Sequence, residues 1–176
     1  MNDRYRIIDD VLPEYLIERI RKIASLEKWS VTLTAGEDDP HVSLAITFTE
    51  KEDTPLCELI TMASNFIGEH AGKTEEDVLR IRLGLIFRDT DKSHKNSKHI
   101  DLPNFICTTA LVYLYDSDGD TFFYDGDEVA FSVTPKRNRC IIFDGDIYHC
   151  SSTPAENQTR MTLNINFAGK PNFCQN

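Results

Sequence analysis

Short apolar runs separated by turn residues dominate the sequence from residue 79 onward. Each run is rich in β-branched or aromatic residues, and clusters of Gly, Pro, Asp or Asn bound it, which is the pattern of β-strands joined by tight turns. The runs are LRIRLGLIF (79–87), TTALVYLYD (108–116), DTFFYD (120–125), EVAFSV (128–133), RCIIFD (139–144), DIYHCSS (146–152) and RMTLNINF (160–167). With a short extended piece around KHID (98–101), this spacing predicts about eight strands, and therefore an antiparallel sandwich or jelly roll.

Two amphipathic patterns precede these strands. Residues 12–28 have apolar side chains three and four positions apart, and Pro13 stands near the start of the pattern. Residues 54–72 show a second apolar stripe that ends at Gly72, a residue often found just after a helix. We therefore expect a mostly β fold in which two N-terminal helices pack on one outer face of the sheet.

The length and charge of the chain limit its class. With 176 residues, of which 40% are apolar, the chain can bury one core but is short for two. We expect a single domain over 1–176, with a helical support region at 1–78 and a jelly-roll core at 79–168. The net charge of −10 disfavours a nucleic-acid partner, because proteins that bind the phosphate backbone concentrate Lys and Arg on one face.

The number of cysteines and the shortness of the apolar runs indicate the cellular compartment of the protein. Five cysteines are an odd number and form no C-x-x-C pair, so the sequence suggests neither a disulfide framework nor a zinc knuckle. The N-terminus is charged where a signal peptide needs an apolar core. No apolar run approaches the roughly 20 residues that span a bilayer. We expect a reduced, cytoplasmic protein without a membrane partner.

A histidine and a carboxylate two positions apart form the first candidate metal site. In an extended segment, His99 and Asp101 would point to the same side and could bind one metal ion. A third ligand would have to come from elsewhere, and His149 lies on a later predicted strand. The other histidines fall in the helical half or, for His94, in a polar loop. Two histidines and one carboxylate form the facial triad of non-haem iron(II) sites.

The last predicted strand has one polar and one apolar face. At a period of two residues, the apolar face consists of Met161, Leu163, Ile165 and Phe167. The polar face consists of Arg160, Thr162, Asn164 and Asn166. A guanidinium that faces a cavity suits a carboxylate, which it can bind through two parallel hydrogen bonds. This face is therefore expected to line a pocket for an acid.

The order of these motifs is the most specific feature of the sequence. After H-x-D at 99–101 come LVYLYD, a GDT turn, RCIIFDGDIYH and an arginine in the pattern H-x10-R-x-T. Over residues 79–168 this order resembles that of the iron(II)- and 2-oxoglutarate-dependent oxygenases, specifically their prolyl-4-hydroxylase-like branch.

This resemblance implies a double-stranded β-helix, a jelly roll that holds its metal at the open end. The family's iron ligands correspond to His99, Asp101 and His149. Arg160 corresponds to the residue that binds the distal carboxylate of 2-oxoglutarate, and Thr162 stands at the hydroxyl position of the family's R-x-S pattern. Tyr113 matches a tyrosine that helps to hold this carboxylate in relatives. Phe87 departs from the pattern, because relatives often have a hydrogen-bonding tyrosine one strand before H-x-D.

The implied activity is hydroxylation of an aliphatic C–H bond, with peptidyl proline as the expected substrate. The resemblance implies Fe(II), 2-oxoglutarate and O2 as cofactor and cosubstrates, with ascorbate as a candidate reductant. A small-molecule or amino-acid hydroxylase of the same family is an alternative. A zinc-dependent hydrolase and a non-catalytic metal-binding jelly roll are further alternatives that use the same three ligands.

The loop before the first two ligands is a candidate substrate lid. Residues 88–105 include Lys92, Lys95 and Lys98, the most basic stretch of an acidic chain. Such loops often determine specificity, because they can close over a rigid scaffold. We expect this loop to flank the pocket and to contact a protein, peptide or small-molecule substrate. The alternative is a solvated charged loop without a partner.

Overall fold

The computed structural model describes residues 4–33, 42–48, 53–88 and 94–173. The helices are α1 (Glu14–Ala24), α2 (Pro55–Ala71) and a short 3-10 helix, η1 (Glu75–Asp77). The strands are β1 (Tyr5–Ile8), β2 (Ser30–Leu33), β3 (Val42–Phe48), β4 (Val78–Phe87), β5 (Cys107–Tyr113), β6 (Thr121–Asp125), β7 (Glu128–Val133), β8 (Cys140–Asp144), β9 (His149–Ser151) and β10 (Thr159–Ala168).

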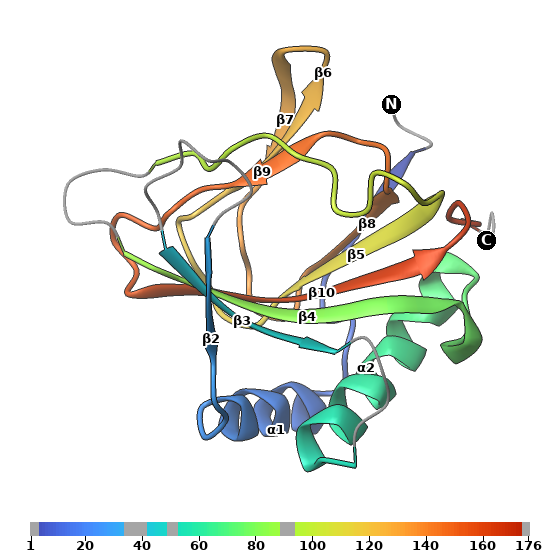
Figure 1. The fold of residues 1–176 in the computed structure, drawn as a ribbon, viewed down its shortest axis with the longest axis vertical. Helices are drawn as coiled ribbons and strands as arrows, with labels where there is room; N and C mark the ends of the chain where they lie inside the picture. The colour runs from blue at the N-terminus through green and yellow to red at the C-terminus, as the bar shows by residue number, and fades with distance from the viewer. Residues whose placement is uncertain (1–3, 34–41, 49–52, 89–93, 174–176) are drawn as a thin grey trace.

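These strands form two antiparallel sheets (Figure 1). The larger sheet has the order β1-β8-β5-β10-β4-β3-β2, and the smaller one has the order β7-β6-β9. At the centre of the larger sheet, β4 and β10 pair along almost their whole length, from Thr159 opposite Phe87 to Phe167 opposite Val78. The sequence-based prediction of an antiparallel jelly roll with two N-terminal helices is confirmed.

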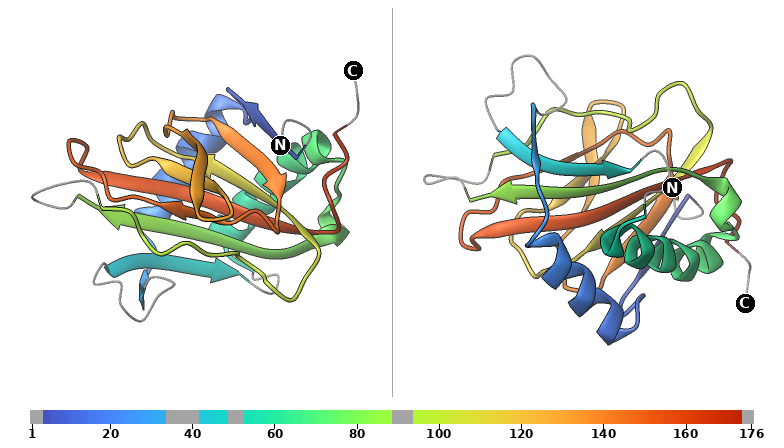
Figure 2. Two further views of the ribbon diagram at one scale, coloured as in Figure 1. Left: turned by 90° about the horizontal axis from the view of Figure 1, so that it is seen from above. Right: turned by 60° about the horizontal axis from the view of Figure 1, so that its bottom comes forward.

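Both helices cover one face of the larger sheet (Figures 1 and 2). The buried cluster between them includes Leu16, Ile17 and Ile20 of α1, Ile60 and Ile67 of α2, Leu83 of β4, and Leu163, Ile165 and Phe167 of β10. Complete burial of each such side chain contributes about 1.5–3 kcal/mol. This layer stabilises the sheet from one side and leaves the opposite face of β4 and β10 available for polar side chains.

The helix ends follow from local hydrogen bonds. In α2, the Thr54 hydroxyl accepts the Cys57 N–H at the first turn, and Gly72 closes the helix with a left-handed φ of 64°. The first helix is shorter than the predicted range of 12–28, because it begins at Glu14 and already ends at Ala24. There the indole N–H of Trp29 donates to the Ala24 carbonyl at 2.9 Å, which satisfies a carbonyl that the helix no longer uses.

Several strands differ from the sequence-based expectation. β1 and β2 were not predicted, since each has only four residues and lies at an edge of the sheet. Together with β3, they add three strands from the range 1–78 to the same sheet. The piece at 98–101 is no regular strand, and only a single bridge joins His99 to His149. Among the described residues, none of the helices has the length and apolar character needed to cross a bilayer.

Candidate active site

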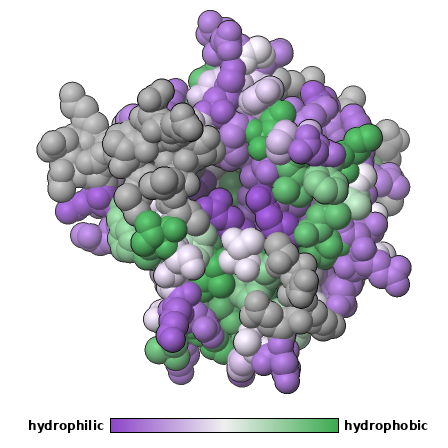
Figure 3. All heavy atoms as spheres, in the orientation of Figure 1, coloured by the Kyte–Doolittle hydropathy of each residue, from purple (hydrophilic) through white to green (hydrophobic). Residues whose placement is uncertain are grey.

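A cavity of about 430 Å³ opens on the face of the larger sheet that the helices do not cover. Side chains of β3, β4 and β10 form its floor, and β9 and the segment around residues 96–101 form the opposite wall. Figure 3 shows hydrophilic residues in the hollow near the centre of this surface. The lining is largely polar, and it contains the three candidate metal ligands together with Arg160 and Thr162.

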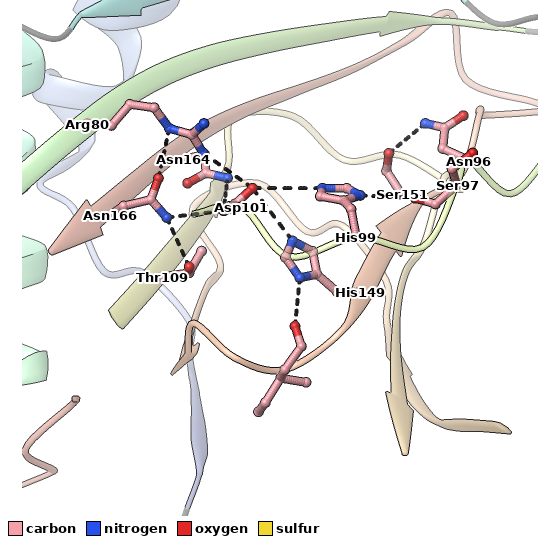
Figure 4. A network of polar contacts seen from close by, with 11 residues as sticks. Arg80, Asn96, Ser97, His99, Asp101, Thr109, His149, Ser151, Asn164 and Asn166 are labelled. Atoms are coloured by element: carbon pink, nitrogen blue, oxygen red, sulfur yellow. Dashed lines mark hydrogen bonds and ion pairs between the residues drawn. The ribbon is translucent and has the colours of Figure 1, made fainter. Parts of the chain in front are cut away.

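The three candidate ligands meet at one point of the cavity (Figure 4). The Nε2 atoms of His99 and His149 lie 3.8 and 3.9 Å from Oδ1 of Asp101, and the candidate ligand atoms all lie within 4.8 Å of one another. Reciprocal backbone hydrogen bonds of 2.9 and 3.0 Å join His99 to His149, which brings residues fifty positions apart into register. The pairing of the two segments therefore builds the cluster.

The second ring nitrogen of each histidine has a backbone partner. Nδ1 of His99 lies 3.0 Å from the Ser97 carbonyl, and Nδ1 of His149 lies 3.0 Å from the Ile147 carbonyl. A carbonyl can only accept, so Nδ1 carries the proton and the Nε2 lone pair points toward Asp101. Burial lowers the pKa of His149 and so favours the neutral imidazole that a metal requires.

Asp101 is held by two asparagines and an arginine (Figure 4). Its Oδ2 accepts hydrogen bonds from Asn164 at 2.9 Å and Asn166 at 3.1 Å, and Nη2 of Arg80 lies 3.3 Å from Oδ1. Burial disfavours the charged carboxylate, but the electrostatic influence of the neighbouring His149 and of Arg80, together with the Asn164 hydrogen bond, outweighs it. The pKa of Asp101 is therefore below its ordinary value, and the group is ionised as a metal ligand must be.

Arg160 occupies another part of the same cavity. Its side chain is almost fully buried, with Nε donating to the Gly119 carbonyl at 2.8 Å and Nη2 donating to Oγ1 of Thr121 at 2.7 Å. Within the described part of the chain, no carboxylate forms an ion pair with this guanidinium. Burial lowers the pKa of Arg160 by disfavouring its charge, so a bound anion would compensate for the lost solvation.

Tyr113 and Thr162 lie beside this arginine in different roles. Thr162 lies two residues after Arg160 on β10 and lines the same cavity. Tyr113 is fully buried behind the wall, where its hydroxyl forms a 2.7 Å hydrogen bond with Oγ1 of Thr121. Thr121 itself lines the cavity and was not identified from the sequence, since a single threonine at a strand start has no distinguishing pattern.

The predicted substrate loop lies partly at the cavity. Asn96 and Ser97 line it, whereas the neighbouring lysines turn toward the β6–β7 hairpin. The Lys95 ammonium lies 4.0 Å from the ring centre of Phe122, and Lys98 donates to the Gly126 carbonyl and to Asp127. Lys92 lies outside the described residues.

Phe87, the predicted departure from the family pattern, is half exposed near the end of β4 and does not line the cavity. The residues of β4 that do line it include Arg80, Arg82, Gly84 and Ile86. The two arginines were not identified from the sequence, although their alternation in LRIRLGLIF is a visible signal.

The sequence matches no protein-family model and no curated protein. Solved structures nevertheless share the fold. A 2OG-Fe(II) oxygenase family oxidoreductase from Burkholderia pseudomallei is 12% identical, with a TM-score of 0.71 over 99% of this chain and 90% of that chain. A Trichoplax adhaerens prolyl hydroxylase, solved with a hypoxia inducible factor peptide fragment, is 16% identical, with a TM-score of 0.69 over 93% and 83%.

A third structure with this fold belongs to an enzyme with a different activity. SnoK, a non-heme alpha ketoglutarate dependent carbocyclase from nogalamycin biosynthesis, is 14% identical, with a TM-score of 0.69 over 96% of this chain and 81% of that chain. At sequence identities this low, the structural likeness shows a common fold and nothing more. The chemistry of this chain therefore has to be inferred from its own residues.

Proposed function

We propose that this protein is an iron(II)- and 2-oxoglutarate-dependent dioxygenase that hydroxylates an aliphatic C–H bond. The observation that carries the proposal is the presence, in one cavity, of a His–Asp–His cluster and a buried arginine without a carboxylate partner among the described residues. A metal site alone would fit several activities. A buried arginine in the same cavity favours an enzyme that binds an acid beside its metal.

The donor set fits iron(II). His99, Asp101 and His149 would occupy three of six positions and leave three open, which suffices for a chelating 2-oxo acid and O2. Both imidazoles have a backbone partner on Nδ1, and Asp101 has two amide donors on Oδ2, so the three ligands are oriented before metal binds. When bound, iron(II), 2-oxoglutarate and O2 supply C–H oxidation coupled to decarboxylation of the oxo acid to succinate and CO2.

The surroundings of Arg160 fit the distal carboxylate of 2-oxoglutarate. Its guanidinium is fixed by Gly119 and Thr121, so it would lose little conformational freedom when an acid binds. Thr162 places a hydroxyl on the same side of β10. Tyr113 would act indirectly, because its hydroxyl bonds to Thr121, which in turn bonds to Arg160. The burial of all these groups strengthens their electrostatic contacts by excluding water.

A peptidyl proline is the substrate that we propose on the basis of the sequence resemblance. The cavity is bordered by Asn96 and Ser97 of a surface segment, and a rim of this kind can receive an extended peptide. The likeness in fold to a prolyl hydroxylase solved with a peptide is compatible with this proposal. A small-molecule substrate is the second candidate, because a cavity of about 430 Å³ has the size of a metabolite site.

Cosubstrate turnover tests the proposal directly. Protein reconstituted with Fe(II) should consume 2-oxoglutarate and O2 and release succinate, with ascorbate sustaining the reaction, and a proline-containing peptide should stimulate the release several-fold. Reconstitution with Zn(II) should give no turnover. Activity that persists under anaerobic conditions without 2-oxoglutarate would instead support a zinc hydrolase, and metal binding without 2-oxoglutarate binding would support a non-catalytic jelly roll.

A further inference from the structure

The tripeptide Asp-Gly-Asp occurs three times in the chain, at 118–120, 125–127 and 144–146. The second copy turns the β6–β7 hairpin, where Gly126 has a positive φ of 58°. In the third copy, Asp144 accepts a hydrogen bond from Arg4 at 2.9 Å. The first copy lies between β5 and β6 and contacts Arg160, to which we assign the cosubstrate. The three copies therefore share a sequence but differ in their surroundings.

Both hydrogen bonds described above for the Arg160 side chain end on one short segment. Nε donates to the Gly119 carbonyl at 2.8 Å, and Nη2 donates to Oγ1 of Thr121 at 2.7 Å. These two acceptors belong to the end of the β5–β6 connection and the start of β6, whereas Arg160 is the second residue of β10. The direction of the guanidinium therefore depends on where residues 119–121 lie relative to the start of β10.

Asp118 ties this segment to the residues that lead into β10. Its Oδ2 accepts the backbone N–H groups of Ala155 at 2.9 Å and Glu156 at 2.8 Å. Its Oδ1 accepts the Asn157 N–H at 3.0 Å, and Oδ1 of Asn157 accepts the Asp118 N–H at 2.9 Å. These hydrogen bonds join the connection before β6 to the connection before β10, a few residues from Arg160.

The Asp118 carboxylate makes these contacts as an ion. Partial burial alone would raise its pKa, but the backbone N–H groups that it accepts outweigh this effect and hold the pKa below its ordinary value. Hydrogen bonds to an ionised acceptor are roughly twice as strong as those between neutral groups. The charged side chain therefore holds the two connections together at neutral pH.

Gly119 is enclosed between the same two connections. A Cβ at this position would lie 2.7 Å from the Ser152 carbonyl oxygen, 3.1 Å from the Pro154 nitrogen and 3.1 Å from Cδ of Arg160. Two of these three atoms belong to the backbone, which cannot turn aside as the end of a flexible side chain can. The lack of a side chain therefore lets the Gly119 carbonyl approach Arg160, and a larger residue would push the segments apart.

We propose that Asp118 and Gly119 are positioning residues that orient Arg160 toward the distal carboxylate of 2-oxoglutarate. This proposal rests on the proposed function and names the residues that prepare its anion site. Asp118 fixes the segment that holds the guanidinium, and Gly119 lets this segment lie against Arg160. An arginine whose direction is fixed before binding loses less conformational entropy when it binds an acid.

Titration with 2-oxoglutarate measures this effect without turnover. Protein loaded with Mn(II) under anaerobic conditions is titrated calorimetrically with 2-oxoglutarate. Asp118→Ala should lower the 2-oxoglutarate affinity several-fold, and Gly119→Ala should lower it at least as much. The Mn(II) affinity in the absence of 2-oxoglutarate should stay unchanged, because the candidate metal ligands are other residues.

2-Oxovalerate distinguishes the positioning of Arg160 from a general loss of structure. This acid has the 2-oxo acid group of 2-oxoglutarate, but a methyl group replaces the distal carboxylate. Asp118→Ala should therefore bind 2-oxovalerate as the unaltered protein does and lose affinity for 2-oxoglutarate alone. An equal loss of affinity for both acids would show that Asp118 has only a structural role, and would overturn the proposal.

A second comparison determines whether Asp118 acts through Arg160. In protein that already carries Arg160→Met, the added substitution Asp118→Ala should have no further effect on 2-oxoglutarate affinity, because the side chain that Asp118 positions is absent. A further several-fold loss of affinity in this background would mean that Asp118 acts by another route, and the proposal would be wrong.

Two further variants serve as controls. Asp118→Asn keeps an acceptor oxygen without the charge and should retain part of the affinity, and it replaces Asp118→Ala in each comparison if that variant does not fold. Asp125→Ala removes the matching aspartate of the second Asp-Gly-Asp, an exposed residue, and should change nothing. An equal loss of affinity in Asp125→Ala and Asp118→Ala would trace the effect to net charge and contradict the proposal.

The unaltered protein and Arg160→Met separate a failure of this proposal from a failure of the proposed function. If the unaltered protein binds neither Mn(II) nor 2-oxoglutarate, the proposed function fails. If Arg160→Met loses 2-oxoglutarate affinity and the variants of Asp118 and Gly119 do not, the proposed function stands and the positioning role is wrong. If Arg160→Met keeps its affinity, another residue anchors the acid and the positioning role is wrong as well.

Discussion

The two faces of β10 differ in chemistry although they alternate along the same ten residues. The side chains of Leu163 and Ile165 are fully buried against the helices. Arg160, Thr162 and Asn164 point to the other side and line the cavity. One face therefore contributes mainly to the free energy of folding, and the other places a guanidinium, a hydroxyl and an amide where a ligand can reach them.

This contrast predicts that the two faces can be damaged separately. Apolar burial on the helix side is favourable in itself. On the cavity side, burial of a cation and of amides is unfavourable, because these groups lose their hydration. Only specific hydrogen bonds or a bound ligand offset this desolvation free energy. Substitutions on the helix face should therefore lower stability with little change in ligand affinity, and substitutions on the cavity face should do the reverse.

The largest effect is expected from His149→Ala. Removal of one of three ligands should abolish measurable Mn(II) or Fe(II) binding and all turnover, while the circular dichroism spectrum stays unchanged. His94→Ala is the matched control, because His94 is exposed and lies outside the cluster. Loss of the metal in His94→Ala with retention in His149→Ala would show that the triad is wrongly assigned.

Leu163→Ala, on the helix-covered face, should instead lower the free energy of unfolding. Deletion of a fully buried leucine typically costs about 2–5 kcal/mol, through lost transfer free energy and the cavity that remains. Urea unfolding of the metal-free protein should show this loss. The Mn(II) affinity of the folded variant should stay within about twofold of the unaltered value. A large fall in affinity would mean that the two faces are coupled.

Asn164→Ala should act on the cavity face alone. It removes one of the two amide donors on Asp101, and the loss of such an outer contact typically lowers metal affinity about 10–100-fold. Asn164 is only partly buried, so we expect a smaller loss of unfolding free energy than in Leu163→Ala. Calorimetric titration with Mn(II) measures the first quantity and urea unfolding the second.

Arg160→Met should give the smallest of the four changes, and one restricted to the cosubstrate. Loss of a charge-assisted contact of about 1.4 kcal/mol or more should raise the 2-oxoglutarate requirement at least about tenfold. Mn(II) affinity without 2-oxoglutarate should be unchanged. An unaltered 2-oxoglutarate requirement would indicate that Arg80 or Arg82, the other arginines of the cavity, anchors the acid.

The elements with a clear periodicity could be predicted from the sequence. The period of two in RMTLNINF gave both faces of β10, and the three- and four-residue spacing gave both helices. The clustering of His99, Asp101 and His149 was also expected, since H-x-D and a later strand histidine fit one metal. The four-residue strands β1 and β2 were missed, because they are too short to show a period.

The contacts between distant segments could not be predicted. Arg80 reaches Asp101 because β4 lies beside β10, and no local pattern encodes this neighbourhood. For the same reason the alternation in LRIRLGLIF indicated a strand but not the function of its arginines. Lys95 and Lys98 were expected at the substrate, and their contacts with Phe122 and Asp127 depend on where the β6–β7 hairpin folds.

An anaerobic crystal structure with Mn(II) and 2-oxoglutarate tests the central claim most directly. The account predicts that His99, Asp101 and His149 hold the metal, that the 2-oxo acid chelates it, and that the distal carboxylate contacts Arg160 and Thr162. A metal bound by other residues, or a distal carboxylate seated on Arg82 with Arg160 left without an anion, would contradict it.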